Sequence, residues 1–206
     1  TYYAFDVASK RNTIIGKDIQ EPSFSPDNTK IAYVKDNNLY VLNLKNNQIT
    51  QVTQDGKINA IINGTTDWVY EEEFAFVKAY EWSKDGKNIA FLRFDESNVR
   101  EFSMQVTGSE LYPSQQVFKY PKAGEANAKV SLHLFNLASK TTKNIVLGSY
   151  EYIPRIKWSH DPNILIATTL NRHQNNLKLY KVITFFILWD GILLECLQKM
   201  LQNKII

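Results

Sequence analysis

Three consecutive glutamates, Glu71, Glu72 and Glu73, lie within the aromatic-rich segment TTDWVYEEEFAF, residues 65–76. Adjacent carboxylates repel one another, and a carboxylate held against apolar rings loses solvation and tends to take up a proton. A bound cation would relieve both effects. A solvated acidic turn, whose flanking aromatic side chains point the other way, is the alternative. The segment therefore predicts either a cation-binding site or an exposed acidic turn.

Other catalytic patterns are missing from the sequence. No GxSxG motif, which carries the nucleophile of α/β-hydrolases, occurs in the chain. The histidines His133, His160 and His173 lie in strand or turn patterns, where a structural role is expected. Cys196 is the single cysteine, so no internal disulfide can form. We expect no catalytic residue, metal site or cofactor from these residues.

Composition narrows the class of protein. The chain has 206 residues, 44% of them hydrophobic, which predicts a globular fold rather than disorder. Its 24 basic and 21 acidic residues are well mixed, without the basic stripe of a nucleic-acid-binding protein. The longest apolar run, 182–189, is too short to span a bilayer. The N-terminus, TYYAFDVASK, has neither an initiator Met nor a signal pattern, so we expect a piece of a longer protein.

A repeated element dominates the rest of the chain. Segments 22–53, 80–95 and 156–171 each contain an aromatic residue, a serine, a polar turn and then an apolar strand. Short strands with alternating polarity and hairpin turns follow, as in IAYVKDNNLYVLNLKNNQITQVT. Four strands per repeated unit favour an all-β, partial β-propeller of four-stranded antiparallel blades over a generic β-sandwich. We expect residues 1–181 to hold the end of one blade, two blades and most of a fourth.

Two segments interrupt this repeat. Residues 56–79 contain the three glutamates and are expected between two blades, whereas residues 96–130 are expected inside the second full blade. Insertions of this size on a regular scaffold are frequent places for function. Arg93 and Arg100 flank an acidic DES triplet in the second case, and we expect them to form structural ion pairs.

The strings NGTTDWVYEEEFAF, RFDESNVREF and KYPKAGEANAKVSLHLFN resemble the N-terminal propeller of the dipeptidyl peptidase IV family of serine exopeptidases. The resemblance covers roughly residues 1–181. It implies that Glu72 and Glu73 project from a short helix and bind the α-ammonium of a peptide substrate. It also implies that a nucleophilic serine lies in a separate α/β-hydrolase domain. The intact enzyme would then remove N-terminal dipeptides whose second residue is Pro or Ala. No arginine in GKDIQEPSF matches the one that this family places near the substrate carbonyl.

Further expectations follow from the resemblance. Residues 96–130 match the family's extended arm and imply a homodimer, although a hairpin folded back on its own blade is equally compatible with the residues. The family implies a periplasmic or cell-surface location. Because the hydrolase motif is missing, the chain could instead be a non-catalytic propeller module that binds peptide N-termini or protein partners.

The C-terminal segment 182–206 departs from the repeat. It lacks turn residues, and Leu193, Leu197, Met200, Leu201 and Ile205 are spaced for one face of a helix. Either the reading frame changes shortly after Lys181, or a terminal amphipathic helix packs on an exposed blade.

Overall fold

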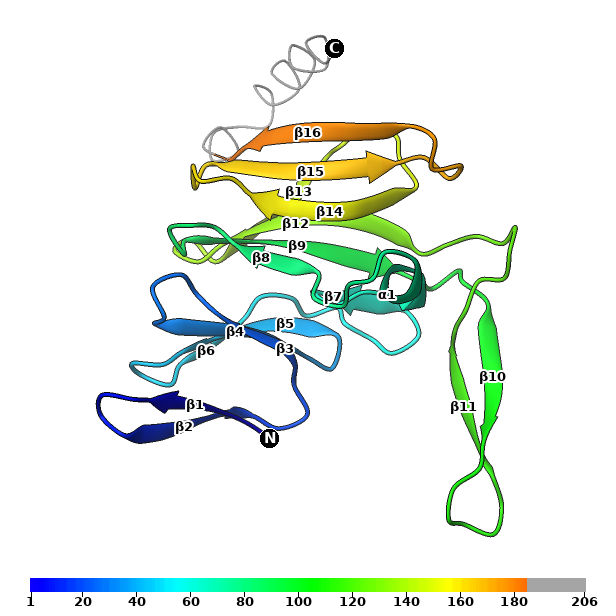
Figure 1. The fold of residues 1–206 in the computed structure, drawn as a ribbon, viewed down its shortest axis with the longest axis horizontal. Helices are drawn as coiled ribbons and strands as arrows, with labels where there is room; N and C mark the ends of the chain where they lie inside the picture. Colours follow the sequence, from blue (N-terminus) through cyan, green and yellow to red (C-terminus); the bar gives the residue numbers. More distant parts are fainter. Residues whose placement is uncertain (185–206) are drawn as a thin grey trace.

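Antiparallel β-strands make up nearly all of the fold. The computed structural model describes residues 1–184 (Figure 1). Within this range the strands form five antiparallel sheets, and the single helix is α1, Trp68–Glu73. Four of the sheets are stacked on one another, with the N-terminus at one end of the stack, and the fifth projects from its side (Figure 1).

The order of the stacked sheets follows the sequence. The first is a hairpin, and the second is a complete four-stranded meander in the order β3-β4-β5-β6. The last has three strands in the order β14-β15-β16. The expected partial propeller is therefore confirmed, with two full blades between two incomplete ones. The bounds of these strands are β1 Tyr2–Asp6, β2 Arg11–Gly16, β3 Gln20–Phe24, β4 Lys30–Lys35, β5 Asn38–Asn43, β6 Ile49–Gln51, β14 Tyr152–Trp158, β15 Ile164–Leu170 and β16 Leu177–Ile183.

The second full blade, here called the split blade, has an edge strand made of two pieces. Strands β7 and β8 both pair with β9, Ile61 opposite Asp95 at one end and Trp82 opposite Ile89 at the other. Residues 64–79, the α1 loop, leave the sheet between the two pieces. We expected residues 56–79 between two blades, but β7 belongs to the sheet, so the loop interrupts a strand. The split blade consists of β7 Ile61–Asn63, β8 Tyr80–Trp82, β9 Asn88–Asp95, β12 Lys129–Asn136 and β13 Thr141–Ile145.

The repeated serine closes the same turn in three blades. The backbone N–H groups of Ser25, Ser83 and Ser159 donate to the carbonyl oxygens of Lys30, Asn88 and Ile164, each at 2.9 Å. In the first two turns the serine hydroxyl also donates to an aspartate two residues later, at 2.6 and 2.7 Å. The turn residues thus satisfy their own polar groups, which explains why this element recurs in the sequence.

Two tryptophans of the repeat link neighbouring blades. The indole Nε1 of Trp82 donates to the carbonyl oxygen of Ser23 at 3.3 Å. The indole of Trp158 donates in the same way to the carbonyl oxygen of Glu81, at 3.1 Å. Both rings lie in apolar clusters between sheets. The split blade and the blade that follows it are therefore each joined to the preceding blade by apolar burial and by a tryptophan hydrogen bond.

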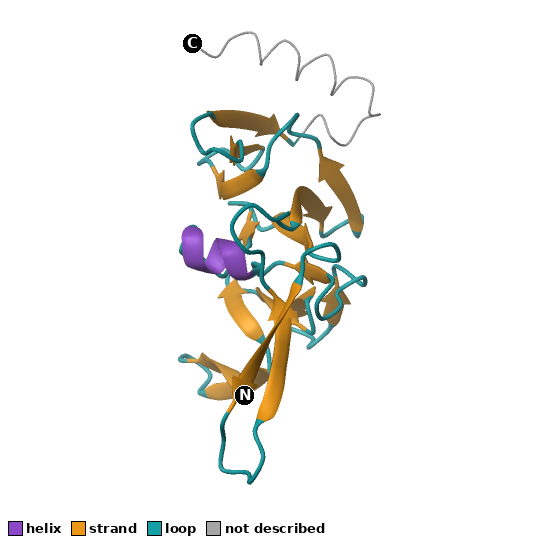
Figure 2. Cartoon of the chain, turned by 90° about the vertical axis from the view of Figure 1, so that its right-hand side faces the viewer, coloured by secondary structure: helices purple, strands orange, loops and turns teal. Residues whose placement is uncertain are grey.

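The arm (residues 96–130) leaves the split blade between β9 and β12, which pair with each other from Lys129 opposite Asp95 onward. It contains the hairpin β10, Glu101–Val106, and β11, Ser114–Lys119. The N–H of Tyr120 donates to the carbonyl oxygen of Arg100 at 3.0 Å and closes its base. Figures 1 and 2 show that the hairpin projects away from the stacked sheets, so it is not folded back on its own blade.

The expected boundary at Lys181 falls inside β16, which continues to Ile183. Beyond that strand, the N–H of Thr184 donates to the carbonyl oxygen of Asn163 at 2.8 Å. The expected terminal helix and Cys196 lie outside the described residues. Between residues 1 and 184, no helix has the length and apolar character needed to cross a bilayer.

Candidate functional site

The α1 loop is closed at its base by backbone hydrogen bonds. The N–H of Gly64 donates to the carbonyl oxygen of Leu92 at 3.1 Å, and the N–H of Ala79 donates to that of Gly64 at 2.9 Å. One step further along the loop, the N–H of Thr66 donates to the carbonyl oxygen of Val77 at 3.1 Å. The loop therefore leaves and re-enters the sheet at one point, which fixes the position of α1 above the split blade.

Asp67 starts the helix. Its side-chain oxygen accepts a hydrogen bond from the N–H of Tyr70 at 3.1 Å, and its carbonyl accepts from the N–H of Glu71 at 3.2 Å. This is the N-cap arrangement that aspartate favours, because it satisfies N–H groups that have no partner within the helix. The carboxyl group is buried, which raises its pKa to about 6 even though the backbone N–H of Tyr70 opposes the shift.

One face of α1 is buried against the split blade and the following blade. Val69 and Tyr70 lie in the core, and the Tyr70 ring meets the Phe94 ring edge-on with centroids 4.8 Å apart. The Tyr70 hydroxyl oxygen accepts a hydrogen bond from the N–H of Ile153 in β14 at 2.8 Å. Burial raises the pKa of Tyr70 well above its usual value, so the hydroxyl stays neutral. The helix is thus joined to two blades.

The C-terminal end of α1 is held by an arginine from β14. Arg155 donates through Nη2 to the carbonyl oxygen of Phe74 at 2.8 Å, and its guanidinium lies 4.8 Å from the centroid of the Phe76 ring. Between these two aromatic residues, Ala75 has a φ of 53°, in the left-handed region that costs an L-residue roughly 1–2 kcal/mol. Sequence reasoning missed Arg155, because its place on an alternating strand predicts simple exposure to solvent.

Glu71, Glu72 and Glu73 are exposed, whereas the aromatic side chains around them pack partly or fully inside. This geometry fits both the cation site and the acidic turn. None of the three glutamate side chains forms a hydrogen bond or ion pair with any residue of the described part of the chain. The last turn of α1 contains no basic residue. Glu71 belongs to the first turn, whereas the carboxylates of Glu72 and Glu73 lie toward the negative, C-terminal end of the helix dipole without a counter-ion from residues 1–184.

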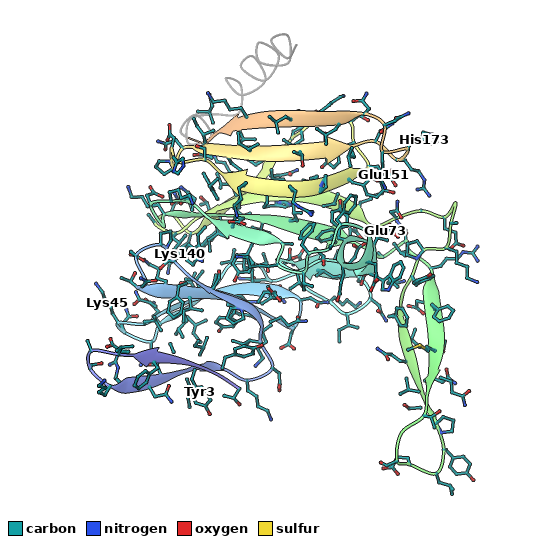
Figure 3. The ribbon with its side chains drawn as sticks, viewed as in Figure 1. Tyr3, Lys45, Glu73, Lys140, Glu151 and His173 are labelled. Carbon is teal, nitrogen blue, oxygen red and sulfur yellow. The ribbon has the colours of Figure 1, made fainter. Side chains whose placement is uncertain are left out.

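The surroundings of Glu73 are acidic and aromatic. Figure 3 shows Glu73 at the same end of the stacked sheets as Glu151 and His173. Burial raises the pKa of Tyr152, and the charges of Glu151 and Glu73 add to this rise. The nearby Arg172 forms an ion pair with Glu151, with an N–O distance of 3.1 Å. This end of the molecule thus presents unpaired negative charge beside aromatic rings.

A second buried carboxyl group lies near the start of α1. Glu96 follows β9, and burial raises its pKa to about 7, with a further contribution from the charge of Asp67. Lys119 opposes the rise. The ammonium group of Lys119 donates to the carbonyl oxygen of Val99 at 2.9 Å and forms an ion pair with the carboxylate of Glu101 at 3.5 Å. Nothing in the DES triplet predicted that one of its acids would be buried.

The remaining candidates have structural surroundings. His133 stacks on Phe91 with ring centroids 5.3 Å apart, and its burial lowers the pKa to about 4. His160 and His173 are exposed in turns. The expected ion pairs are confirmed, with Arg93 bonded to Asp55 at 2.8 Å and Arg100 to Glu125 at 3.2 Å.

A cavity lies far from these glutamates. Its volume is about 450 Å³, and it lies between the first hairpin and the β3–β6 blade, lined by residues such as Asp6, Arg11 and Lys45. Figure 3 places Lys45 at the end of the sheets opposite to Glu73. The cavity therefore does not form part of the α1 site.

Comparison with known proteins identifies the family. Residues 1–185 match the family described as dipeptidyl peptidase IV (DPP IV) N-terminal region. The chain is 35% identical over 188 residues to a probable dipeptidyl-aminopeptidase B of Talaromyces stipitatus, covering 81% of this chain and 21% of that protein. It is 34% identical over 179 residues to dipeptidyl aminopeptidase B of Saccharomyces cerevisiae, covering 82% of this chain and 22% of that protein.

A solved structure has the same fold. The crystal structure of Porphyromonas gingivalis dipeptidyl peptidase 4 superposes with a TM-score of 0.84 and 43% sequence identity, covering 89% of this chain and 27% of that one. The chain thus spans between 21% and 27% of the lengths of these relatives. The family match extends over the whole described region, including α1 and the arm. The chain therefore belongs to the dipeptidyl peptidase IV N-terminal region family.

Proposed function

We propose that this chain is the substrate-amine-binding part of a dipeptidyl peptidase IV-like serine exopeptidase that removes N-terminal dipeptides with Pro or Ala in second place. In this proposal Glu72 and Glu73 bind the α-ammonium of the peptide. The nucleophilic serine, with its histidine and aspartate, belongs to an α/β-hydrolase domain outside these 206 residues.

The observation that carries the proposal is the pair of unpaired carboxylates at the C-terminal end of α1. Two adjacent carboxylates repel each other, and each also interacts unfavourably with the negative end of the helix dipole. The helix is nevertheless held in place by an N-cap, a buried tyrosine and an arginine from the next blade. Unfavourable charges on a helix that is otherwise firmly held are typical of a functional site. Here a bound ligand would neutralise the carboxylates of Glu72 and Glu73.

The chemistry of an ammonium group fits this arrangement. It supplies three hydrogen-bond donors and one positive charge, so two carboxylates can share it through charge-assisted hydrogen bonds. Holding the amino terminus fixes how far the peptide reaches toward the nucleophile. The carbonyl of the second residue is then the one attacked, which is catalysis by positioning.

The test uses the full-length protein that contains these residues, with glycyl-prolyl-p-nitroanilide as substrate. The double variant E72Q/E73Q keeps the size of both side chains and removes their charge. Each lost charged hydrogen bond is worth about 1.5–3 kcal/mol, so kcat/KM should fall by at least about tenfold. The single variant E71Q is the matched control and should behave as the wild type. An unchanged KM and kcat in E72Q/E73Q would disprove the anchoring role.

A non-catalytic role has a different signature. If the full-length protein releases no p-nitroaniline, binding of a fluorescent Gly-Pro peptide is measured with free and acetylated amino termini. Binding that requires the free amine and is lost in E72Q/E73Q would identify a module that only captures peptide N-termini.

We further propose that the arm packs against a second copy of the protein. The hairpin β10–β11 projects from the blades and exposes Phe102, Met104, Leu111 and Tyr112. These side chains give an apolar surface of the kind found in protein interfaces. Replacing residues 101–119 by a short turn between Arg100 and Tyr120 should convert a dimer into a monomer in light scattering. A dimer that persists would exclude this interface.

The location proposed from the family is the periplasm or the cell surface. Cell fractionation of the source organism with an antibody against the full-length protein tests it. Recovery of the protein with cytoplasmic markers would contradict the proposal.

A further inference from the structure

Helix α1 is too short to persist without external support. It has six residues, whereas isolated helices below about 12–15 residues are marginal in water. The buried side chains of Val69 and Tyr70 attach the first part of α1 to the core. Glu72 and Glu73 belong to the last turn, so their position depends on what holds the C-terminal end.

Arg155 supplies that support. Its Nη2 donates to the carbonyl oxygen of Phe74 at 2.8 Å, and Phe74 is the C-cap residue that follows Glu73 directly. The guanidinium also lies over the ring of Phe76, 4.8 Å from its centroid. Arg155 thus contacts the chain on both sides of Ala75, which has a positive φ just after the helix. A planar group with several fixed donors suits this double contact better than an ammonium group would.

A bulge in β14 lies beside the residues of that strand that contact the α1 loop. The pairing between β14 and β15 shifts register between Tyr152 and Arg155. Within the bulge, the N–H of Ile153 points to the Tyr70 hydroxyl, 2.8 Å away, instead of to a ladder partner. Pro154 in the bulge has no N–H to lose. Bulges commonly redirect side chains beside functional sites, and this one turns two groups of β14 toward α1.

The charge of Arg155 adds to its mechanical role. A cation close to a helix C-terminus interacts favourably with the helix dipole. Within residues 1–184 no cation forms an ion pair with Glu72 or Glu73, so Arg155 offsets the dipole without neutralising the carboxylates. The two carboxylates remain available for a ligand.

We propose that Arg155 is a positioning residue that fixes the C-terminal turn of α1 and thereby orients Glu72 and Glu73 toward the substrate ammonium group. This inference rests on the proposed function of the glutamate pair. Arg155 does not contact the substrate in this proposal, and it acts only through the backbone at Phe74 and the ring of Phe76.

The test is a double-mutant cycle in the full-length protein with glycyl-prolyl-p-nitroanilide. R155M should raise KM about tenfold while kcat changes little, because the loss of one charged hydrogen bond loosens binding. In the E72Q/E73Q background the same substitution should have almost no further effect, since the groups that it orients are already disabled. R155K should recover part of the loss, because it can still donate to Phe74. K157M, on the same strand but paired with Glu81, is the matched control and should leave KM unchanged.

Hydrogen exchange gives a readout that does not depend on activity. Amides of residues 68–76 should exchange faster in R155M than in the wild type, and at the wild-type rate in K157M. Wild-type kinetics in R155M, or equal effects of R155M in both backgrounds, would overturn the inference. Normal kinetics in E72Q/E73Q would instead overturn the proposed function itself, so the two failures are distinguishable. If R155M does not fold, failure of R155K to change either KM or exchange overturns the inference.

Discussion

The hydroxyl oxygen of Tyr70 in α1 accepts a hydrogen bond from the backbone N–H of Ile153, a residue 83 positions later in the sequence. The bond joins the α1 loop of the split blade to the next blade. Both groups are buried, so neither can turn to water if the other is removed. This one contact therefore makes the position of the helix depend on how two blades pack.

Tyr70→Phe should destabilise this junction without changing its shape. The substitution removes the acceptor and leaves the N–H of Ile153 buried and unpaired, at a cost of about 1–3 kcal/mol. Amide exchange in peptides covering residues 150–156 should accelerate accordingly. Tyr33→Phe is a control at a buried tyrosine on β4, far from Ile153 in the sequence. Unchanged exchange in Tyr70→Phe would mean that the hydroxyl does not hold Ile153.

A second contact joins α1 to the arm. The Trp68 and Tyr120 rings meet edge-on with centroids 4.3 Å apart, and Tyr120 closes the arm base. A double-mutant cycle with Trp68→Leu and Tyr120→Leu should give a coupling energy of about 0.5–1.5 kcal/mol in thermal unfolding. The pair Trp68→Leu and Tyr112→Leu should be additive, because Tyr112 is exposed between β10 and β11 and makes no ring contact with Trp68 or Tyr120 in the described structure. Additivity in the first pair would show that arm and helix are independent.

The sequence predicted the blades well because their turns are local. An aromatic residue, a serine and an aspartate in a few positions determine a complete hydrogen-bonded turn, and Ser25 and Ser83 form the same one. The short helix that carries Glu72 and Glu73 was predicted from resemblance alone. Its N-cap, Asp67, is a local signal that the residues also contain.

Features that depend on the folded chain were not predictable. Strand β7 has only three residues, too few for a period-2 pattern, so its place in the split blade was missed. Arg155 is exposed, as its alternating position on β14 predicts, so the sequence gives no sign that its guanidinium reaches the carbonyl oxygen of Phe74. The sequence around Glu96 predicts a solvent-exposed carboxylate. Its burial depends on the packing around the α1 loop and the arm.

Gly64 marks the point where β7 ends and the α1 loop begins. Its φ is 80°, and an added Cβ would lie 3.0 Å from Cγ2 of Val34 and 3.3 Å from Cδ1 of Leu39. Gly64→Ala should therefore combine backbone strain of roughly 1–2 kcal/mol with a clash against the β3–β6 blade. Gly124→Ala is the matched control, because its φ is 88° but no atom lies within 4 Å of the added Cβ. Gly64→Ala should lower Tm clearly more than Gly124→Ala, and equal shifts would contradict the steric argument.

Glu96 should make stability depend on pH. Burial raises its pKa in the folded protein from 4.5 to about 7. The folded state therefore holds the proton more tightly than the unfolded state does. This favours the folded state fully below about pH 4.5, and the benefit is lost as the pH rises through about 7. His133 has the opposite tendency, because its pKa falls to about 4, so the total slope does not isolate Glu96.

Comparison of Glu96→Gln with the wild type removes the background slope due to His133, and the difference reports Glu96 together with its coupling to Asp67. The variant should match the wild type near pH 4, where Glu96 is mostly protonated in both the folded and the unfolded state. At pH 8 it should be more stable by about 1–2 kcal/mol, a value below the full shift because solvent screens part of the interaction. Tm measured at both pH values tests this, with Glu110→Gln at the exposed tip of the arm as control. A Tm difference between Glu96→Gln and the wild type that is the same at pH 4 and pH 8 would show that Glu96 ionises normally in the folded protein.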